Sequence, residues 1–155
     1  MNELNLIFHC NSEEKTSSLA QKAAFLCEKG DVFALFGTLG MGKSVFARAF
    51  VQKLCGKTEV PSPTFTLVQM YDAPDFEIYH FDLYRLKSAE EIFELGIEEA
   101  MYEGVCLIEW PEKMGGYLPR KAIKINITPT AEGRQIEFIF SNRQTYDRFL
   151  SLQEK

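Results

Sequence analysis

Short apolar runs alternate with segments of helical periodicity in the first half of the chain. Residues 31–37 (DVFALFG) form a mostly apolar run of strand length, typical of a strand buried on both faces of a parallel sheet. Residues 5–10 predict a short strand before it. Residues 11–30, which lie between these two runs, predict a helix with Asn11 as its cap and Gly30 after its end.

The pattern of the remaining chain predicts further helices and strands. In chain order they are a helix over 43–56, strands over 66–71 and 76–86, helices over 88–96 and 97–104, a strand over 105–110, a loop over 115–120, a hairpin over 121–130 and 134–141, and a helix over 142–153. The order is α/β with an antiparallel end. It predicts three layers: a mixed sheet, with a parallel core and antiparallel C-terminal strands, flanked by helices.

The length and composition of the chain limit its possible architecture and its cellular compartment. The chain has 155 residues, of which 46% are hydrophobic and 25% charged, so we expect one globular domain over residues 1–155. No apolar stretch approaches a membrane span, and the first residues lack the basic region of a signal peptide. The four cysteines are widely spaced, as expected for buried thiols in a reducing compartment. These features predict a cytoplasmic protein that does not associate with a membrane.

The charge of the chain bears on its partners. The formal net charge is -5, and lysine and arginine residues are scattered among acidic ones. A domain that binds nucleic acid by itself usually has a basic face. We therefore expect no autonomous binding of DNA or RNA, although the protein can still act on nucleic acid through a partner.

A glycine-rich segment at the end of the 31–37 strand gives the clearest indication of a ligand. It fits the phosphate-binding pattern G-x-x-x-x-G-K-[ST], and its residues are Gly37, Thr38, Leu39, Gly40, Met41, Gly42, Lys43 and Ser44. The glycines let backbone N–H groups converge on phosphate oxygens, and the following helix points its positive end at the same place. The pattern predicts Lys43 at the β- and γ-phosphates and the Ser44 hydroxyl on Mg²⁺, in a P-loop NTPase-like fold.

A nucleotide site also needs a carboxylate, because Mg²⁺ prefers oxygen ligands. Glu109 ends the buried strand 105–110, and Asp82 lies in the alternating strand 76–86, so both are candidate metal-linked and catalytic acids. A third candidate is Thr64 in the loop SPTFT, where Pro63 and the preceding Pro61 exclude a helix and the threonine offers an exposed hydroxyl. Such a loop is typical of switch segments that close over the γ-phosphate.

The rest of the sequence narrows the choice of nucleotide chemistry. No Asn-Lys-x-Asp segment for guanine occurs, which disfavours GTP, and no arginine-rich lid of the kind found in small kinases is present. ATP hydrolysis is therefore favoured. A small-molecule kinase and a nucleotide-gated binding module with negligible chemistry remain as alternatives.

Five segments resemble one family in their order and spacing. They are GTLGMGKS, VPSPTFTLVQMY, IYHFDLYRL, ELGIEEA and LIEWPEKM, and the resemblance to the TsaE (YjeE) family runs over residues 31–119. The resemblance implies a small P-loop ATPase required for threonylcarbamoyladenosine modification of tRNA. It further implies ATP and Mg²⁺ as cofactors, TsaB and TsaD as partners, and contact with tRNA only through them.

The resemblance also implies roles for matching positions. The loop from Gly37 to Lys43 would surround the phosphates, although Thr38 and Met41 differ from the Asp and Ala common in the family. Ser44 would hold Mg²⁺, Glu109 matches the metal-linked acid beside the aromatic Trp110, and Asp82 and Thr64 match functional positions. Candidate contacts to the rest of the nucleotide are Asn11, Ser12 and Arg134. Arg85 is a candidate arginine finger, without which hydrolysis would be slow until a partner binds.

Overall fold

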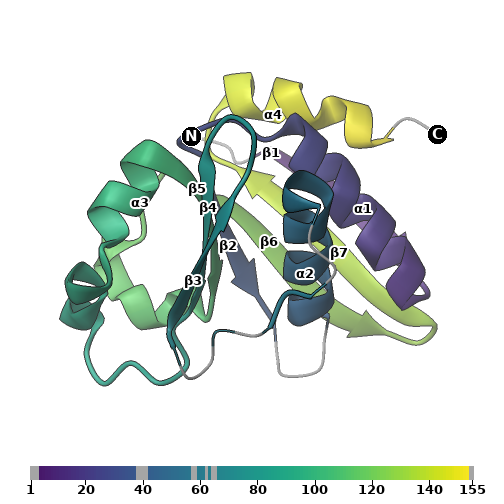
Figure 1. Ribbon diagram of the computed structural model, residues 1–155. Helices are drawn as coiled ribbons and strands as arrows, with labels where there is room; N and C mark the ends of the chain where they lie inside the picture. The colour runs from purple at the N-terminus through teal and green to yellow at the C-terminus, as the bar shows by residue number, and fades with distance from the viewer. Residues whose placement is uncertain (1–3, 38–41, 57–58, 62, 64–65, 154–155) are drawn as a thin grey trace.

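Seven strands of the described residues form one mixed sheet in the order β1-β7-β6-β2-β5-β4-β3 (Figure 1). The computed structural model describes the chain except residues 1–3, 38–41, 57–58, 62, 64–65 and 154–155. The strands are β1 (Leu4–Cys10), β2 (Val32–Phe36), β3 (Val68–Asp72), β4 (Glu77–Asp82), β5 (Gly104–Glu109), β6 (Ile123–Thr130) and β7 (Gly133–Phe140). The expected α/β fold with a mixed sheet is confirmed.

Helices cover both faces of the sheet (Figure 1). On one face lie α1 (Glu13–Leu26), α2 (Lys43–Cys55) and α4 (Arg143–Phe149), the last of which continues into the 3₁₀ helix η3 (Leu150–Gln153). On the other lie α3 (Ile97–Glu103) and the 3₁₀ helices η1 (Ala89–Leu95) and η2 (Pro111–Tyr117). None of the helices in the described part of the chain is long and apolar enough to cross a membrane.

Strand β2 lies at the centre of the sheet and is buried on both faces, as its apolar run predicts. Phe33 and Leu35 face the core made with α1, α2 and α4, whereas Val32 belongs to the core on the α3 face. The Phe33 ring packs edge-on against Phe50 of α2 and Phe149 of α4. Burial of such large side chains contributes the main stabilising term, at about 25 cal/mol per Å² of apolar surface.

Parallel and antiparallel pairing divide the sheet into a core and its edges. Strands β6, β2, β5 and β4 are parallel to one another, whereas β7 pairs antiparallel with β6 and β1, and β3 pairs antiparallel with β4. The expected hairpin over 121–130 and 134–141 is present as β6–β7. Its first strand is parallel to β2, so the antiparallel region starts at β7.

Some local predictions differ from the structure. Helix α1 is capped by Ser12, whose Oγ accepts a hydrogen bond from Lys15 N at 3.2 Å, and not by Asn11. Ser12 accepts this bond because its extended backbone places the oxygen over the first turn. Residues 89–95 form a 3₁₀ helix instead of an α-helix, and Gly96, in the left-handed region, separates it from α3. Part of the expected 115–120 loop belongs to η2.

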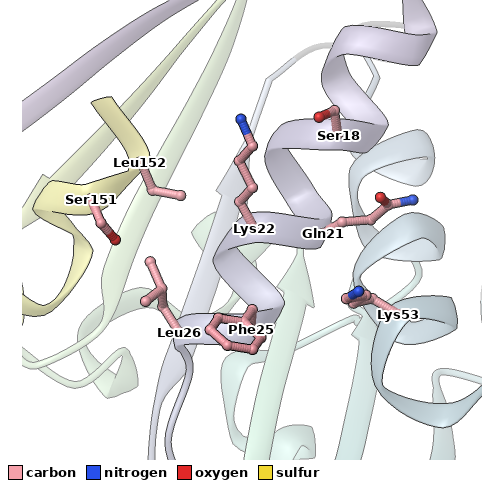
Figure 2. Close-up of a pocket in the computed structure, with 8 residues that line it drawn as sticks. All are labelled: Ser18, Gln21, Lys22, Phe25, Leu26, Lys53, Ser151 and Leu152. Atoms are coloured by element: carbon pink, nitrogen blue, oxygen red, sulfur yellow. The ribbon is translucent and has the colours of Figure 1, made fainter. Parts of the chain in front are cut away.

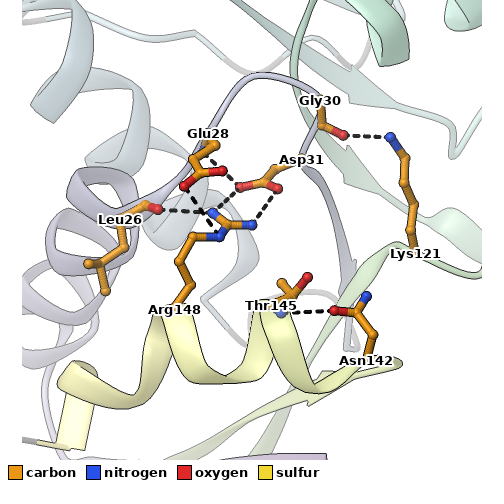
Figure 3. Close-up of polar contacts among 8 residues, drawn as sticks. All are labelled: Leu26, Glu28, Gly30, Asp31, Lys121, Asn142, Thr145 and Arg148. Atoms are coloured by element: carbon orange, nitrogen blue, oxygen red, sulfur yellow. Dashed lines mark hydrogen bonds and ion pairs between the residues drawn. The ribbon is translucent and has the colours of Figure 1, made fainter.

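An ion-pair cluster fixes α4 to the turn that leads into β2 (Figure 3). The Arg148 guanidinium donates two hydrogen bonds to the Asp31 carboxylate, both at 2.9 Å, and a third to the Leu26 carbonyl at 3.0 Å. The hydrogen bond to Asp31 raises the pKa of Arg148. On the other side of the turn, Lys121 Nζ donates to the Gly30 carbonyl at 2.8 Å. The start of β2, and hence the strand that leads to the glycine-rich segment, is held from both sides.

Candidate nucleotide-binding site

The two predicted acids lie side by side at the carboxyl ends of adjacent strands. Asp82 ends β4 and Glu109 ends β5, and the register pairs the two residues directly. On its other side Glu109 pairs with Leu35, two residues before Gly37. Ligands of open α/β sheets bind at such carboxyl ends, so the topology brings both acids to the strand that precedes the glycine-rich segment.

Alternation along the strands sets which face these acids occupy. Residues two apart on a strand share a face, so Asp82 shares one with Ile78, and Glu109 shares one with Leu107. Ile78 and Leu107 both belong to the core under α1 and α2. The two carboxylates therefore lie on the face covered by α2, the helix that begins at Lys43.

Lys43 is buried at the start of α2 and has an aromatic partner. Its Nζ lies 3.8 Å from the centroid of the Trp110 ring and has no hydrogen-bond partner within the described residues. Burial lowers the pKa of Lys43, and the negative charges of Glu109, Glu112 and Asp82 oppose that shift. A buried ammonium group without hydrogen-bond acceptors is costly, so this Nζ is suited to take up an anionic ligand.

Two residues with left-handed backbone conformation flank the acids. Trp110, with φ 59, directly follows Glu109, and Leu67, with φ 70, accepts the hydrogen bond of the Asp82 N–H at 3.0 Å. Non-glycine residues in this region are strained, and such strain concentrates at functional sites. Beyond the strands, Tyr84 N donates to Asp82 Oδ1 at 3.1 Å, and its ring lies 5.0 Å from that of Trp110.

Gly37 and Gly42 border the segment that lies outside the described residues, and both have positive φ. A Cβ at Gly37 would lie 2.7 Å from the carbonyl oxygen of Ile127, and one at Gly42 would lie 2.6 Å from Nη1 of Arg134. The Ile127 contact is with backbone and excludes a side chain at Gly37, whereas at Gly42 the end of the Arg134 side chain can move and the positive φ is what favours glycine. The second contact places the Arg134 guanidinium beside the start of α2, at one end of the predicted phosphate loop.

Arg134 also lines a hollow of about 500 Å³ at the β1–α1 connection and the β6–β7 turn. Asn11 lines the same hollow, so two of the three predicted nucleotide contacts lie together. Ser12 does not line it, because its hydroxyl caps α1. The hollow is large enough for part of a nucleotide and adjoins the start of α2 through Arg134.

The remaining predicted residues divide into two groups. Ser44 is exposed in the first turn of α2, and Arg85 is exposed after β4. The others lie outside the described residues, and they are Thr38, Leu39, Gly40, Met41 and Thr64.

One residue of the cluster has no role in the sequence prediction. His80, two residues before Asp82, is buried, and its Nε2 lies 2.6 Å from Oε2 of Glu109. The signal that points to it is strand alternation, since a histidine two positions before a strand-end acid shares the face of that acid.

The donor set is compatible with Mg²⁺. No group of three or more His, Cys, Asp or Glu residues suited to hold a metal ion occurs among the residues that the structure describes. Mg²⁺ does not need such a cage, because it keeps several waters and takes one or two carboxylates together with substrate phosphates. Asp82, Glu109 and the Ser44 hydroxyl supply oxygens of the required kind.

A second hollow lies on the outer surface of α1, between α2 and η3 (Figure 2). It has a volume of about 330 Å³ and contains Phe25, Lys22 and Lys53, but none of the predicted site residues. It therefore adds nothing to the nucleotide site.

Comparison with known proteins relates this arrangement to a family. The family profile described as "Threonylcarbamoyl adenosine biosynthesis protein TsaE" matches residues 10–136. The tRNA threonylcarbamoyladenosine biosynthesis protein TsaE of Rickettsia conorii is 42% identical over 92% of this chain and 82% of its own length. The protein of the same name from Bacillus subtilis is 33% identical over 86% of this chain and 90% of its own length.

A solved structure is also similar. The crystal structure of Bacillus subtilis YdiB superposes with a TM-score of 0.75 at 28% identity, covering 97% of this chain and 94% of its own. The matched region contains the strand ends that carry Asp82 and Glu109 and the helix that begins at Lys43. The chain belongs to the TsaE family of threonylcarbamoyl adenosine biosynthesis proteins.

Proposed function

We propose that this protein is a Mg²⁺-dependent ATPase that acts with TsaB and TsaD in threonylcarbamoyladenosine modification of tRNA. The proposal of ATPase activity rests on one observation. Lys43 Nζ is buried at a glycine-bordered helix start and has no hydrogen-bond acceptor among the residues that the structure describes, and two paired carboxylates lie at the ends of the neighbouring strands. The names of the matching relatives, which refer to tRNA threonylcarbamoyladenosine biosynthesis, support the second part.

In this proposal the phosphates of ATP take the place of the aromatic ring as the partner of Lys43. The ammonium group and the N–H groups at the start of α2 would stabilise negative charge as it develops on the transferring phosphoryl group. Gly42 leaves room for Arg134 beside this position. Arg134 and Asn11 are the proposed contacts to the remainder of the nucleotide, in the hollow between them.

The metal would be held by the Ser44 hydroxyl and by Glu109 or Asp82. Bound there, Mg²⁺ supplies a positive charge that neutralises the β- and γ-phosphate oxygens. Burial of both carboxylates keeps bulk water away from them and strengthens their attraction for a cation. The carboxylate that does not hold the metal would orient the attacking water, and Thr64 is proposed to assist it.

Hydrolysis by the isolated protein is expected to be slow. An added arginine finger accelerates this type of reaction by about 10³–10⁵. Arg85 is the candidate within this chain, and it is exposed. We infer that TsaB and TsaD complete the site and that hydrolysis resets their assembly, with tRNA contacted through them.

The test is phosphate release from ATP, measured with Mg²⁺ and with EDTA for the wild type, Glu109→Gln and Asp82→Asn. The wild type should turn over ATP only with Mg²⁺, and each variant should lose about 10² or more in kcat, the typical cost of removing one stabilising group. The matched control is Glu103→Gln, an exposed acid on α3, which should behave as the wild type.

Two other outcomes identify the alternatives. A phosphorylated metabolite formed without release of inorganic phosphate would show a small-molecule kinase. Unchanged turnover and unchanged partner function in both Asp82→Ala and Glu109→Ala would show a nucleotide-gated binding module. Either result would contradict the proposed function.

A further inference from the structure

The register of β4 and β5 makes His80 a diagonal neighbour of Glu109. His80 pairs directly with Leu107, and Glu109 lies two residues further along β5 on the same face. Diagonal neighbours lie within reach of long side chains. The imidazole therefore comes from a strand position two residues before the end of β4, whereas the acid that it contacts is at the end of β5.

The contact between these two side chains is short and buried. His80 Nε2 and Glu109 Oε2 are 2.6 Å apart, and the residues are 2% and 4% exposed. To an ionised Glu109 carboxylate, which can only accept hydrogen bonds, the donor is Nε2–H of His80. The bond occupies one of the two carboxylate oxygens of Glu109. Because it holds that oxygen in place, it limits rotation of the carboxylate.

The other imidazole nitrogen shows that packing alone does not explain His80. Nδ1 is buried and has no hydrogen-bond partner within the described part of the chain. A buried polar atom without a partner lowers the stability of the fold. The neighbours on this face, Ile78 and Leu107, are apolar and pack without such a cost. An apolar side chain would bury no such atom, and what the imidazole adds at this position is its bond to Glu109.

We propose that His80 is the positioning residue of Glu109: its Nε2–H holds the carboxylate in the one orientation in which Glu109 supports Mg²⁺-dependent nucleotide binding. This role deepens the proposed function and rests on it. Groups that orient metal-linked side chains typically contribute about 10–100-fold to metal affinity or activity. His80 itself need not touch nucleotide or metal.

The experiment measures ADP affinity by calorimetry, with Mg²⁺ and with EDTA, for three variants. His80→Phe keeps a ring and removes the donor, and His80→Gln restores an N–H near the position of Nε2. Ile78→Val, on the same strand and face, is the control for loosened packing. We expect His80→Phe to lose about 10–100-fold in ADP affinity with Mg²⁺ and less than 2-fold with EDTA. His80→Gln should recover most of the loss, and Ile78→Val should match the wild type.

A second measurement separates positioning from a general structural effect. In a Glu109→Gln background, the His80→Phe substitution should change ADP affinity with Mg²⁺ by less than 2-fold, because residues that act as a unit are not additive. In ¹⁵N-histidine NMR spectra of the wild type, His80 should carry a proton on Nε2. An Nε2 without a proton, or an undiminished effect of His80→Phe in the Glu109→Gln background, would overturn the proposal.

The outcomes distinguish this role from the proposed function. Wild-type ADP binding that depends on Mg²⁺, together with an unchanged His80→Phe variant, would overturn the role of His80 and leave the proposed function standing. Equal loss in His80→Phe and Ile78→Val, or no recovery in a folded His80→Gln variant, would do the same. Wild-type ADP binding that is indifferent to Mg²⁺ would overturn both.

Discussion

At the scale of single residues, the site is a small group of buried charges. Lys43, Asp82 and Glu109 are each 4–5% exposed, although charged side chains are rarely buried in proteins. Within the described part of the chain, Lys43 Nζ contacts an aromatic ring and no hydrogen-bond acceptor. A buried cation in this arrangement has more to gain from an anionic ligand than an exposed lysine has, because an exposed ammonium is already hydrated.

Trp110 is the single tryptophan of the chain, and its ring lies against Lys43, so its fluorescence should report nucleotide binding. Titration with Mg²⁺ and ATP should change the emission intensity in a saturable way, because Lys43 would leave the ring for the phosphates. Lys43→Ala should show no such response over the same concentrations. An equal response in Lys43→Ala would mean that the ring senses something other than this lysine.

At the scale of elements, two glycines at opposite ends of α2 have different tasks. Gly42 precedes the helix and Gly56 follows it, and both are in the left-handed region. A Cβ at Gly56 would meet nothing within 4 Å, whereas one at Gly42 would meet Arg134. Gly56 thus serves the backbone turn alone, and Gly42 serves the turn and the close approach of a neighbour.

Substitution of these glycines by alanine separates the two tasks. Gly42→Ala and Gly56→Ala should each lower the free energy of unfolding by about 1–2 kcal/mol, the cost of a left-handed alanine. In urea unfolding the two variants should therefore look alike. In calorimetry with ADP, Gly42→Ala should lose at least 10-fold in affinity, and Gly56→Ala should bind as the wild type does. Equal ADP affinity in both variants would contradict a phosphate loop at Gly42.

Two Arg–Asp pairs that involve α4 provide a second test at this scale. Arg148→Ala should lower the free energy of unfolding by about 2 kcal/mol, because it removes several charged hydrogen bonds in a partly buried place (Figure 3). Arg143→Ala, whose pair with Asp147 is exposed, should change it by less than about 0.5 kcal/mol. Urea unfolding of both variants measures the difference. Equal effects would mean that the Arg148 cluster does not fix α4 to the turn before β2.

At the scale of the whole molecule, the sheet topology makes the site. Four parallel strands bring their carboxyl ends to one edge, where the ends of β2, β5 and β4 lie next to one another. Antiparallel strands extend the sheet on both sides of this parallel core. The site is therefore formed by residues far apart in the sequence, such as Lys43 and Glu109, that only the complete sheet places side by side.

The stability of the whole molecule should fall at alkaline pH because of its buried thiols. Burial raises the pKa of Cys106 from 9.0 to about 12, so the unfolded state releases this proton first as the pH rises. The contribution of the buried, protonated Cys106 thiol to the free energy of unfolding is intact below pH 9 and is lost between pH 9 and pH 12. The stabilising effect of Cys106 relative to Cys106→Ala should thus shrink by about 1–2 kcal/mol between pH 8 and pH 10.5.

Urea unfolding at several pH values measures this change. The control is Val105→Ala on the same strand, which is equally buried and has no proton to release, so its cost should be independent of pH. A pH-independent difference between the wild type and Cys106→Ala would contradict the assignment of the alkaline loss to this thiol.

Much of this organisation follows from the sequence by simple periodicity. The apolar run of β2, Lys43 at the start of α2 and the acid at the end of β5 each have local signals, and the structure has these three features in the expected places. The pairing of His80 with Glu109 has no local signal, because it depends on the register between two strands that are 21 residues apart in sequence. Local patterns likewise do not determine the contact of Lys43 with Trp110.

The details that differ from the sequence prediction also have physical reasons. Asn11 and Ser12 are both good helix caps, and the backbone geometry of Ser12 decides between them. The 3₁₀ helix η1, which lies in the helix predicted over 88–96, begins with a capping interaction in which Ser88 N donates to Glu91 Oε1 at 2.9 Å. That interaction does not distinguish a 3₁₀ helix from an α-helix, and Gly96 ends the element after two turns.

The most direct test of the account is the rate of phosphate release from ATP in the presence of Mg²⁺, measured with and without TsaB, TsaD and tRNA, alongside the yield of threonylcarbamoyladenosine. We predict slow release by the protein alone, stimulation of at least 10-fold by the partners, and loss of both release and modification in Glu109→Gln. Partners that leave the rate of the wild type unchanged, or a Glu109→Gln variant that supports both activities fully, would contradict the account.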